Sequence, residues 1–427
     1  MPTTSNDGAL FMTNRCREIL QVLGPGLLMA GAAIGVSHLV QATRAGADYG
    51  YQLLLIILLV NLFKYPFFEY GHRYTAATGK NLLEAYREMG LFFLWAFILL
   101  NIVTAVVSIA GVTMITAGLA ANLFGDFWSL AIWSAILIGI SMVIVMLGHY
   151  RFLDKFMKLM MAVLFVATVI ACAAALIKGP QAAPDFIGAT PWTMVGLGFV
   201  IALMGWMPAP IELSVWQSLW MQAKAKTLGR PITVRDALAD FNIGYGLTVI
   251  LAVMFLMMGA LVLYGTGIEF APGGVAFTAQ LIEVYTTTLG QWAWPIITVA
   301  AFVTMFSTTL TIVDVYPRSL SEGTRLALPI IKINPRPWHY LWMVVIAVAA
   351  VMVISLFQSN WRAMLDLATT IAFLAAPVFA FLNYKAITSK AVPPEYRPGK
   401  AMRLLSLAGM IYFILFGLAY VGIKLWA

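Results

Sequence analysis

The sequence predicts an all-α integral membrane protein in which two membrane-spanning helices are broken near the middle of the bilayer. Of its 427 residues, 62% are hydrophobic and only 10% are charged, and a soluble fold could not bury that much apolar surface. Two long apolar stretches are interrupted, at Gly35-Val36-Ser37-His38 and at Met207-Pro208-Ala209-Pro210-Ile211-Glu212. Backbone at membrane depth leaves the helix only where it lines a cavity or is buried in protein, so the two breaks predict a binding site inside the membrane.

The apolar stretches, taken in order, define the domain organisation. A helix needs about 20 apolar residues to cross the hydrocarbon core, and this criterion predicts eleven spans, at residues 24–43, 50–72, 91–120, 128–148, 156–177, 193–220, 240–264, 289–314, 339–357, 363–383 and 404–424. Helices 1–5 (24–177) and helices 6–10 (193–383) form two halves of a single transmembrane domain, with a tail (1–23) before them and helix 11 (404–424) appended. An odd number of helices in each half inverts the second half, and breaks in helices 1 and 6 are typical of the LeuT-type fold.

The distribution of basic residues predicts the orientation. The segments on the external side of the membrane hold only Arg44, Lys178, Arg362 and Lys424, and Lys64 lies within a span. The other 21 of the 26 Lys and Arg residues lie in the segments on the cytoplasmic side. This asymmetry predicts a cytoplasmic N-terminus and an external C-terminus, and we expect the plasma membrane. The net charge of +8 is then explained by loops that face anionic lipid, and no nucleic-acid partner is expected.

Several other classes of protein are disfavoured. The first fourteen residues lack a basic region followed by an apolar core, so no cleavable signal peptide is expected. Cys16 and Cys172 match no disulfide or zinc spacing. The loops carry no nucleophile–base pair or nucleotide-binding loop, so we expect neither an enzyme nor a cofactor. The sequence leaves the oligomeric state open.

Five motifs resemble those of the Nramp family of divalent-metal transporters, and the resemblance covers most of the chain. They are Gly24-Pro25-Gly26-Leu27-Leu28-Met29-Ala30, Ala45-Gly46-Ala47-Asp48-Tyr49-Gly50-Tyr51-Gln52-Leu53-Leu54, Thr78-Gly79-Lys80-Asn81-Leu82, Arg151-Phe152-Leu153-Asp154-Lys155 and Ser307-Thr308-Thr309-Leu310-Thr311. The resemblance implies a cation transporter with the LeuT-type fold, in agreement with the two breaks.

The chain departs from that family at the positions that bind metal. The family's Asp-Pro-Gly-Asn motif in helix 1 is replaced by residues 35–38, and its Met-Pro-His motif in helix 6 by Pro210, Ile211 and Glu212. Thr369 stands near the polar Gln of the family's helix 10. Residues 91–125 contain no Asp or Glu, where the family's helix 3 carries acidic residues of a proton path. The resemblance therefore implies a rebuilt site without family-type proton coupling.

The candidate substrate-binding residues lie at or near the two breaks. They are Gly35, Ser37, His38, Trp206, Met207, Pro210, Glu212 and Thr369, of which His38 and Glu212 are candidate metal ligands. An intramembrane carboxylate is a functional candidate by default; alternatively, Glu212 caps the second half-helix of span 6. His38 is either a substrate contact or a hydrogen-bonded structural residue.

Other polar residues within the spans receive simpler explanations. Lys64 and Glu69 are expected near the inner face, where long side chains reach the interface. Two i,i+4 ion pairs are predicted, Asp314 with Arg318 and Arg362 with Asp366. The run Ser307-Thr308-Thr309 could line a sodium-like site, although hydroxyls bonded to their own helix are commoner.

Two kinds of substrate are compatible with these residues. The first is a divalent cation that keeps most of its hydration shell, Mg²⁺ or Mn²⁺, because carboxylate, hydroxyl and carbonyl oxygens suit hard ions. The second is a small organic cation or amine, neutralised by Glu212 and bordered by the rings of Trp206, Trp216 and Trp220.

Overall fold

The chain folds into a bundle of long helices, seen in a computed structural model that describes residues 24–148, 151–183, 185–271, 273–331, 333–357 and 360–426. Its elements are α2 (Pro25–Ala33), η1 (Val36–Ala42), α3 (Thr43–Tyr49), α4 (Leu54–Thr78), α5 (Leu82–Met89), α6 (Leu91–Phe124), α7 (Leu130–Leu147), α8 (Arg151–Lys178), α9 (Met194–Trp206), α10 (Leu213–Leu228), α11 (Val234–Val262), α12 (Gly274–Leu289), η2 (Gln291–Ala293), α13 (Trp294–Ala327), α14 (Pro335–Phe357), α15 (Trp361–Ile387), η3 (Pro394–Tyr396) and α16 (Lys400–Trp426). The predicted tail, with Cys16, lies outside the described residues.

The eleven predicted spans are all represented. Within the described residues, ten helices are long and apolar enough to cross a membrane. The remaining predicted span is divided between α9 and α10. Two further helices, α5 and α12, lie between spans, and α5 begins with a capping box formed by Asn81 and Glu84.

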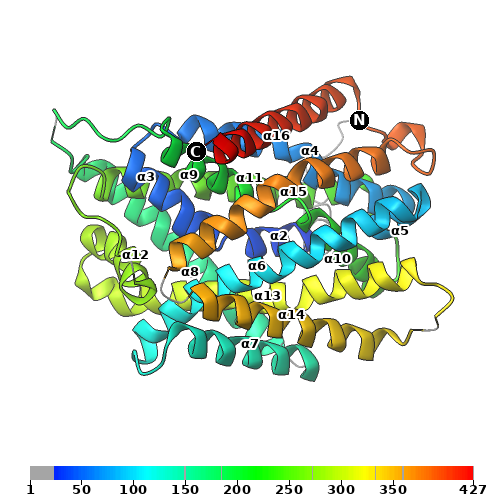
Figure 1. Cartoon of the computed structure of the whole chain (residues 1–427), viewed down its shortest axis with the longest axis horizontal. Helices are drawn as coiled ribbons and strands as arrows, with labels where there is room; N and C mark the ends of the chain where they lie inside the picture. The colour runs from blue at the N-terminus through cyan, green and yellow to red at the C-terminus, as the bar shows by residue number, and fades with distance from the viewer. Residues whose placement is uncertain are drawn as a thin grey trace, which may run out of the picture.

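The helices differ in how deeply they are packed. The most apolar window of the first span, α2 to α3, is 78% buried within the protein, and that of the eighth, η2 with α13, is 72% buried. The corresponding window of α16 is only 17% buried, and those of α7, α8 and α14 are each 28% buried. In Figure 1, α16 lies along one edge of the bundle and α7 and α14 along the opposite edge. The first broken helix and α13 are therefore central, and the peripheral helices present their apolar faces to lipid.

Glycines bring the first span against α11. A Cβ atom on Gly46 would lie 2.0 Å from the carbonyl oxygen of Leu256, and one on Gly259 would lie 2.1 Å from that of Thr43. Small residues at such crossings let two membrane helices approach to backbone contact. This crossing fixes α3, the second part of the first broken helix, against α11.

Candidate functional site

The first break is shorter than the sequence predicts. Helix α2 ends at Ala33, only Ile34 and Gly35 leave the helix, and residues 36–42 form the π-helix η1. The predicted interruption over residues 35–38 is therefore wrong at its end, because Ser37 and His38 belong to the wide turns of η1. Gly35 permits a close approach to α13, since a Cβ atom there would lie 3.0 Å from Oγ1 of Thr308.

The second break lies where the sequence predicts it. Helix α9 ends at Trp206, helix α10 begins at Leu213, and residues 207–212 are not helical. Proline cannot continue a helix without losing a backbone hydrogen bond, and this segment contains both Pro208 and Pro210. Its carbonyl groups consequently need partners from outside the helix.

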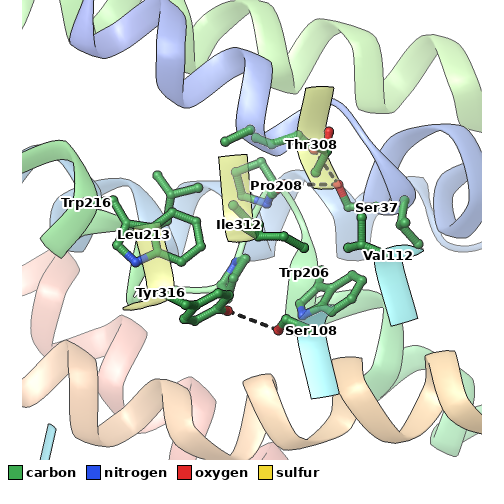
Figure 2. A pocket seen from close by; sticks show the side chains of 15 residues that line it. Ser37, Ser108, Val112, Trp206, Pro208, Leu213, Trp216, Thr308, Ile312 and Tyr316 are labelled. Atoms are coloured by element: carbon green, nitrogen blue, oxygen red, sulfur yellow. Dashed lines mark hydrogen bonds between the residues drawn. The ribbon is translucent and has the colours of Figure 1, made fainter. Parts of the chain in front are cut away.

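Ser37 joins the two breaks. Its Oγ lies 2.8 Å from the carbonyl oxygen of Ala33 and 3.1 Å from that of Pro208, and Figure 2 shows the second contact as a dashed line. A single hydroxyl therefore lies within hydrogen-bond distance of carbonyl groups at the end of α2 and in the segment between α9 and α10, and its one O–H can donate to either. The two breaks meet in the core, as expected of a binding site built from interrupted helices.

A small cavity of about 40 Å³ lies at this junction (Figure 2). A buried water needs roughly 10–15 Å³ on this measure, so the cavity has room for about three waters. Four of its lining residues carry hydroxyl groups, namely Ser37, Ser108, Thr308 and Tyr316. The indole rings of Trp206 and Trp216 also line it, and neither indole N–H has a hydrogen-bond partner among the described residues.

The predicted site residues separate into two groups. Ser37, Trp206 and Pro210 line the cavity, whereas the other five do not, namely Gly35, His38, Met207, Glu212 and Thr369. Thr369 is fully buried and its hydroxyl donates to the carbonyl oxygen of Leu365, 2.9 Å away on its own helix. Sequence reasoning missed Ser108, Thr308 and Tyr316 as a group, because they come from α6 and α13, which are far from the breaks in the chain.

His38 is held between two helices rather than facing the cavity. Its Nδ1 lies 2.7 Å from Oγ of Ser37 and 2.9 Å from the carbonyl oxygen of Ala33, and its Nε2 lies 3.0 Å from the carbonyl oxygen of Thr248. The ring is fully buried and both nitrogens have partners. This geometry matches the structural alternative, in which His38 ties the first break to α11.

Glu212 stands behind the cavity wall. It occupies the N-cap position of α10, but its side chain makes no capping hydrogen bond, so the capping alternative is wrong. Its Oε1 accepts a hydrogen bond of 3.2 Å from the hydroxyl of Tyr316, which also lies 3.0 Å from Oγ of Ser108. The carboxylate is fully buried, and its Oε2 has no partner among the described residues. Tyr316 thus connects the carboxylate to the cavity.

The described side chains do not form a metal cluster. Three or more His, Cys, Asp or Glu residues nowhere come together within the described ranges closely enough to hold an ion.

The predicted sodium-like run in α13 forms hydrogen bonds within its own helix. The hydroxyls of Thr308 and Thr309 lie 3.3 and 3.2 Å from carbonyl oxygens four residues earlier in α13. They follow the commoner alternative for Ser and Thr in membrane helices.

Lys64 is buried in the protein and contacts the end of α9. Its side chain is fully buried, and Nζ donates to the carbonyl oxygens of Met204 at 2.7 Å, Gly205 at 2.7 Å and Ala209 at 2.9 Å. The prediction that Lys64 reaches the interface is wrong, because ten residues of α4 precede it and a rise of 1.5 Å per residue places it about 15 Å inside the helix. The position of Lys64 far from both ends of its predicted span is the feature of the sequence that indicates a buried lysine.

The predicted ion pairs are half confirmed. Arg318 donates to Asp314 at 2.7 Å, as its i,i+4 spacing predicts. Asp366 instead pairs with Arg44, 3.1 Å away on α3, while the Arg362 guanidinium donates to the carbonyl oxygen of Phe270. The Arg44 guanidinium also lies 4.8 Å from the ring centroid of Phe199. A tertiary pair therefore replaces the predicted local one and joins α3 to α15.

The two broken helices that meet at a central cavity place the protein in the class with the LeuT-type fold. Solved structures agree: an Eremococcus coleocola manganese transporter in complex with an aromatic bis-isothiourea substituted compound matches with a TM-score of 0.68, at 13% identity over 98% of this chain and 88% of that chain. MhsT in complex with L-phenylalanine matches with a TM-score of 0.63, at 13% identity over 94% of this chain and 97% of that chain. The two five-helix halves and the appended helix follow from this fold.

Sequence comparison identifies the family. The model of natural resistance-associated macrophage protein-like (Nramp) sequences matches residues 26–422, and the chain belongs to this family. An uncharacterized protein of Pasteurella multocida, PM0681, is 41% identical over 405 residues, which cover 94% of this chain and 92% of that protein. The metal transporter NRAT1 of Oryza sativa is 25% identical over 254 residues, which cover 58% of this chain and 46% of that protein.

Proposed function

We propose that this chain is a secondary transporter that moves a cation across the membrane by alternating access, with its substrate site in the cavity between the two breaks. The observation that carries this proposal is the junction itself, where the hydroxyl of Ser37 spans the two broken helices. Membership of a family of metal-ion transporters supports a cationic substrate. Because both breaks contribute to one cavity, a movement of either half of the bundle changes access to it.

The chemistry of the cavity favours a hard divalent ion that keeps part of its hydration shell, Mg²⁺ or Mn²⁺. The polar groups at its wall are hydroxyls and indole N–H groups, and the sulfur-bearing Met207 and the imidazole of His38 are not part of the wall. Oxygen ligands select hard ions, whereas thioether and imidazole groups select softer ones. An indole N–H cannot bind a bare cation but can donate to the oxygen of a water that the ion carries.

Glu212 supplies the negative charge in this proposal. A bound ion in contact with the Tyr316 hydroxyl would lie about 6 Å from the carboxylate, where the attraction is about 3 kcal/mol per unit of ion charge at an effective dielectric constant of about 20. That energy corresponds to roughly a hundredfold in affinity per unit of charge, and to roughly ten-thousandfold for a divalent ion. The carboxylate therefore dominates the electrostatics of a site whose wall is otherwise neutral.

A small organic cation is the second candidate, and the aromatic wall favours it. The ring centroids of Trp216 and Tyr316 are 4.7 Å apart with an interplanar angle of 82°, and Trp206 completes a partly aromatic enclosure. Ring faces attract organic cations. The small volume limits this candidate to ions such as methylammonium.

Uptake by proteoliposomes distinguishes these substrates. Wild type, Glu212→Gln and the control Glu283→Gln, which alters an exposed carboxylate on α12, are compared with Mg²⁺, Mn²⁺ and methylammonium. We expect divalent-ion uptake to be abolished in Glu212→Gln, because the affinity for the ion falls roughly ten-thousandfold, and to be unchanged in Glu283→Gln. Methylammonium uptake without metal uptake would support the second candidate, and no uptake of any of the three would contradict a cation substrate.

Proton coupling by the acidic route of the family is not part of this proposal. Helix α6 contains no Asp or Glu, and it contributes Ser108 to the cavity wall. Transport is then driven by the gradient of the ion or by the membrane potential. A pH-sensitive dye in the vesicle lumen tests this, since acidification that accompanies substrate uptake would refute it. The excess of basic residues in alternate loops supports a cytoplasmic N-terminus and an external C-terminus, and we propose the plasma membrane as the location.

A further inference from the structure

The carbonyl groups at the end of α9 converge on one side chain. Met204 and Gly205 belong to the last turn of α9 and Ala209 to the break that follows, and all three carbonyl oxygens lie within 2.9 Å of Nζ of Lys64. The last carbonyl groups of a helix have no intrahelical partners. They also carry the negative end of the helix dipole, which attracts a cation.

The contacts of Lys64 match the donors of an ammonium group. An ammonium group has three N–H donors and no acceptor, whereas a neutral amine has only two donors. Three acceptors within 2.9 Å use all three donors of the ammonium.

We propose that Lys64 is a built-in cation, whose ammonium takes the position that a bound monovalent ion would take on the carbonyl groups of a broken helix. In secondary transporters with broken helices, carbonyl groups at half-helix C-termini coordinate coupling ions. Here the covalent tether of α4 provides the charge instead. The second break keeps its shape without bound Na⁺ or K⁺, and transport does not depend on either ion.

The built-in cation also limits what the substrate can contact. The carbonyl oxygen of Ala209 belongs to a residue of the cavity wall and is already satisfied by Lys64. The carbonyl groups of Met204 and Gly205 are satisfied in the same way. The substrate must therefore rely on the hydroxyls, on other carbonyl groups and on its own water, which deepens the proposal of a hydrated ion.

The test is a cation rescue measured by thermal unfolding in detergent, which requires no substrate flux and so stands apart from the transport proposal. Lys64→Ala leaves the three carbonyl groups around an empty ammonium-sized space. We expect its melting temperature to fall in N-methylglucamine chloride and to recover most of the loss in ammonium, methylammonium or potassium chloride. Wild type should show no such dependence. Lys64→Met should lose stability without recovery, because its apolar chain fills the space.

Lys385→Ala is the matched control. That lysine is half-buried on α15, with Nζ 3.7 Å from the ring centroid of Phe93, and its loss should give no dependence on the cation. Three results would overturn the proposal: Lys64→Met as stable as wild type, Lys64→Ala destabilised equally in every salt, or Na⁺ dependence of wild-type stability. The last comparison needs no variant, so the proposal remains testable if Lys64→Ala cannot be purified.

Discussion

The contact between Gly205 and α15 provides a stringent test of the site geometry. A Cβ atom on Gly205 would lie 1.8 Å from the carbonyl oxygen of Thr369, whereas a carbon normally stays about 3.3 Å from such an oxygen. In Gly205→Ala the backbones of α9 and α15 must therefore separate by about 1.5 Å, since neither atom is at the end of a flexible side chain. Overpacking of this kind costs about 1–3 kcal/mol.

The same movement displaces one of the carbonyl groups that Lys64 binds. We therefore expect Gly205→Ala to lower the melting temperature and to reduce substrate uptake together. The control is Gly198→Ala on the same helix, where a Cβ atom would meet nothing within 4 Å. Alanine favours a helix over glycine by about 1 kcal/mol, so this control should be as stable as wild type or more stable. Equal melting temperatures for the two variants would refute the reasoning.

Two further predictions concern long-range contacts. Arg44→Ala removes the ion pair with Asp366, whose side chain is 37% exposed. A partly exposed pair contributes about 1 kcal/mol. The equilibrium constant for packing of α3 against α15 should therefore fall about fivefold. Faster maleimide labelling of Ser37→Cys in the Arg44→Ala background would show this, and an unchanged rate would contradict it. His38→Ala should lower the melting temperature, because a buried carbonyl group loses the N–H donor of the imidazole ring. It should leave the ratio of Mg²⁺ to Mn²⁺ uptake unchanged, and a changed ratio would reinstate His38 as a metal ligand.

Local patterns in the sequence determine the spans, the second break and one ion pair. Apolar length predicts the helices because each must cross the hydrocarbon core. The two prolines of residues 207–212 end α9 wherever the rest of the chain packs. Asp314 and Arg318 are one turn apart on a single helix, so their contact follows from helix geometry. Each of these features depends on residues that are neighbours in the chain.

The tertiary structure alone decides which polar groups meet at the breaks. The sequence places Lys64 in helix 2, but only the packing of α4 against α9 aims its ammonium at three carbonyl groups. Asp366 has a local candidate partner, Arg362, yet it pairs with Arg44, which lies on another helix. His38 and Glu212 lie beside the breaks, as their places in the sequence predict, but neither side chain lines the cavity. A buried polar group takes the partner that packing brings within hydrogen-bond distance, and spacing along the chain does not encode that choice.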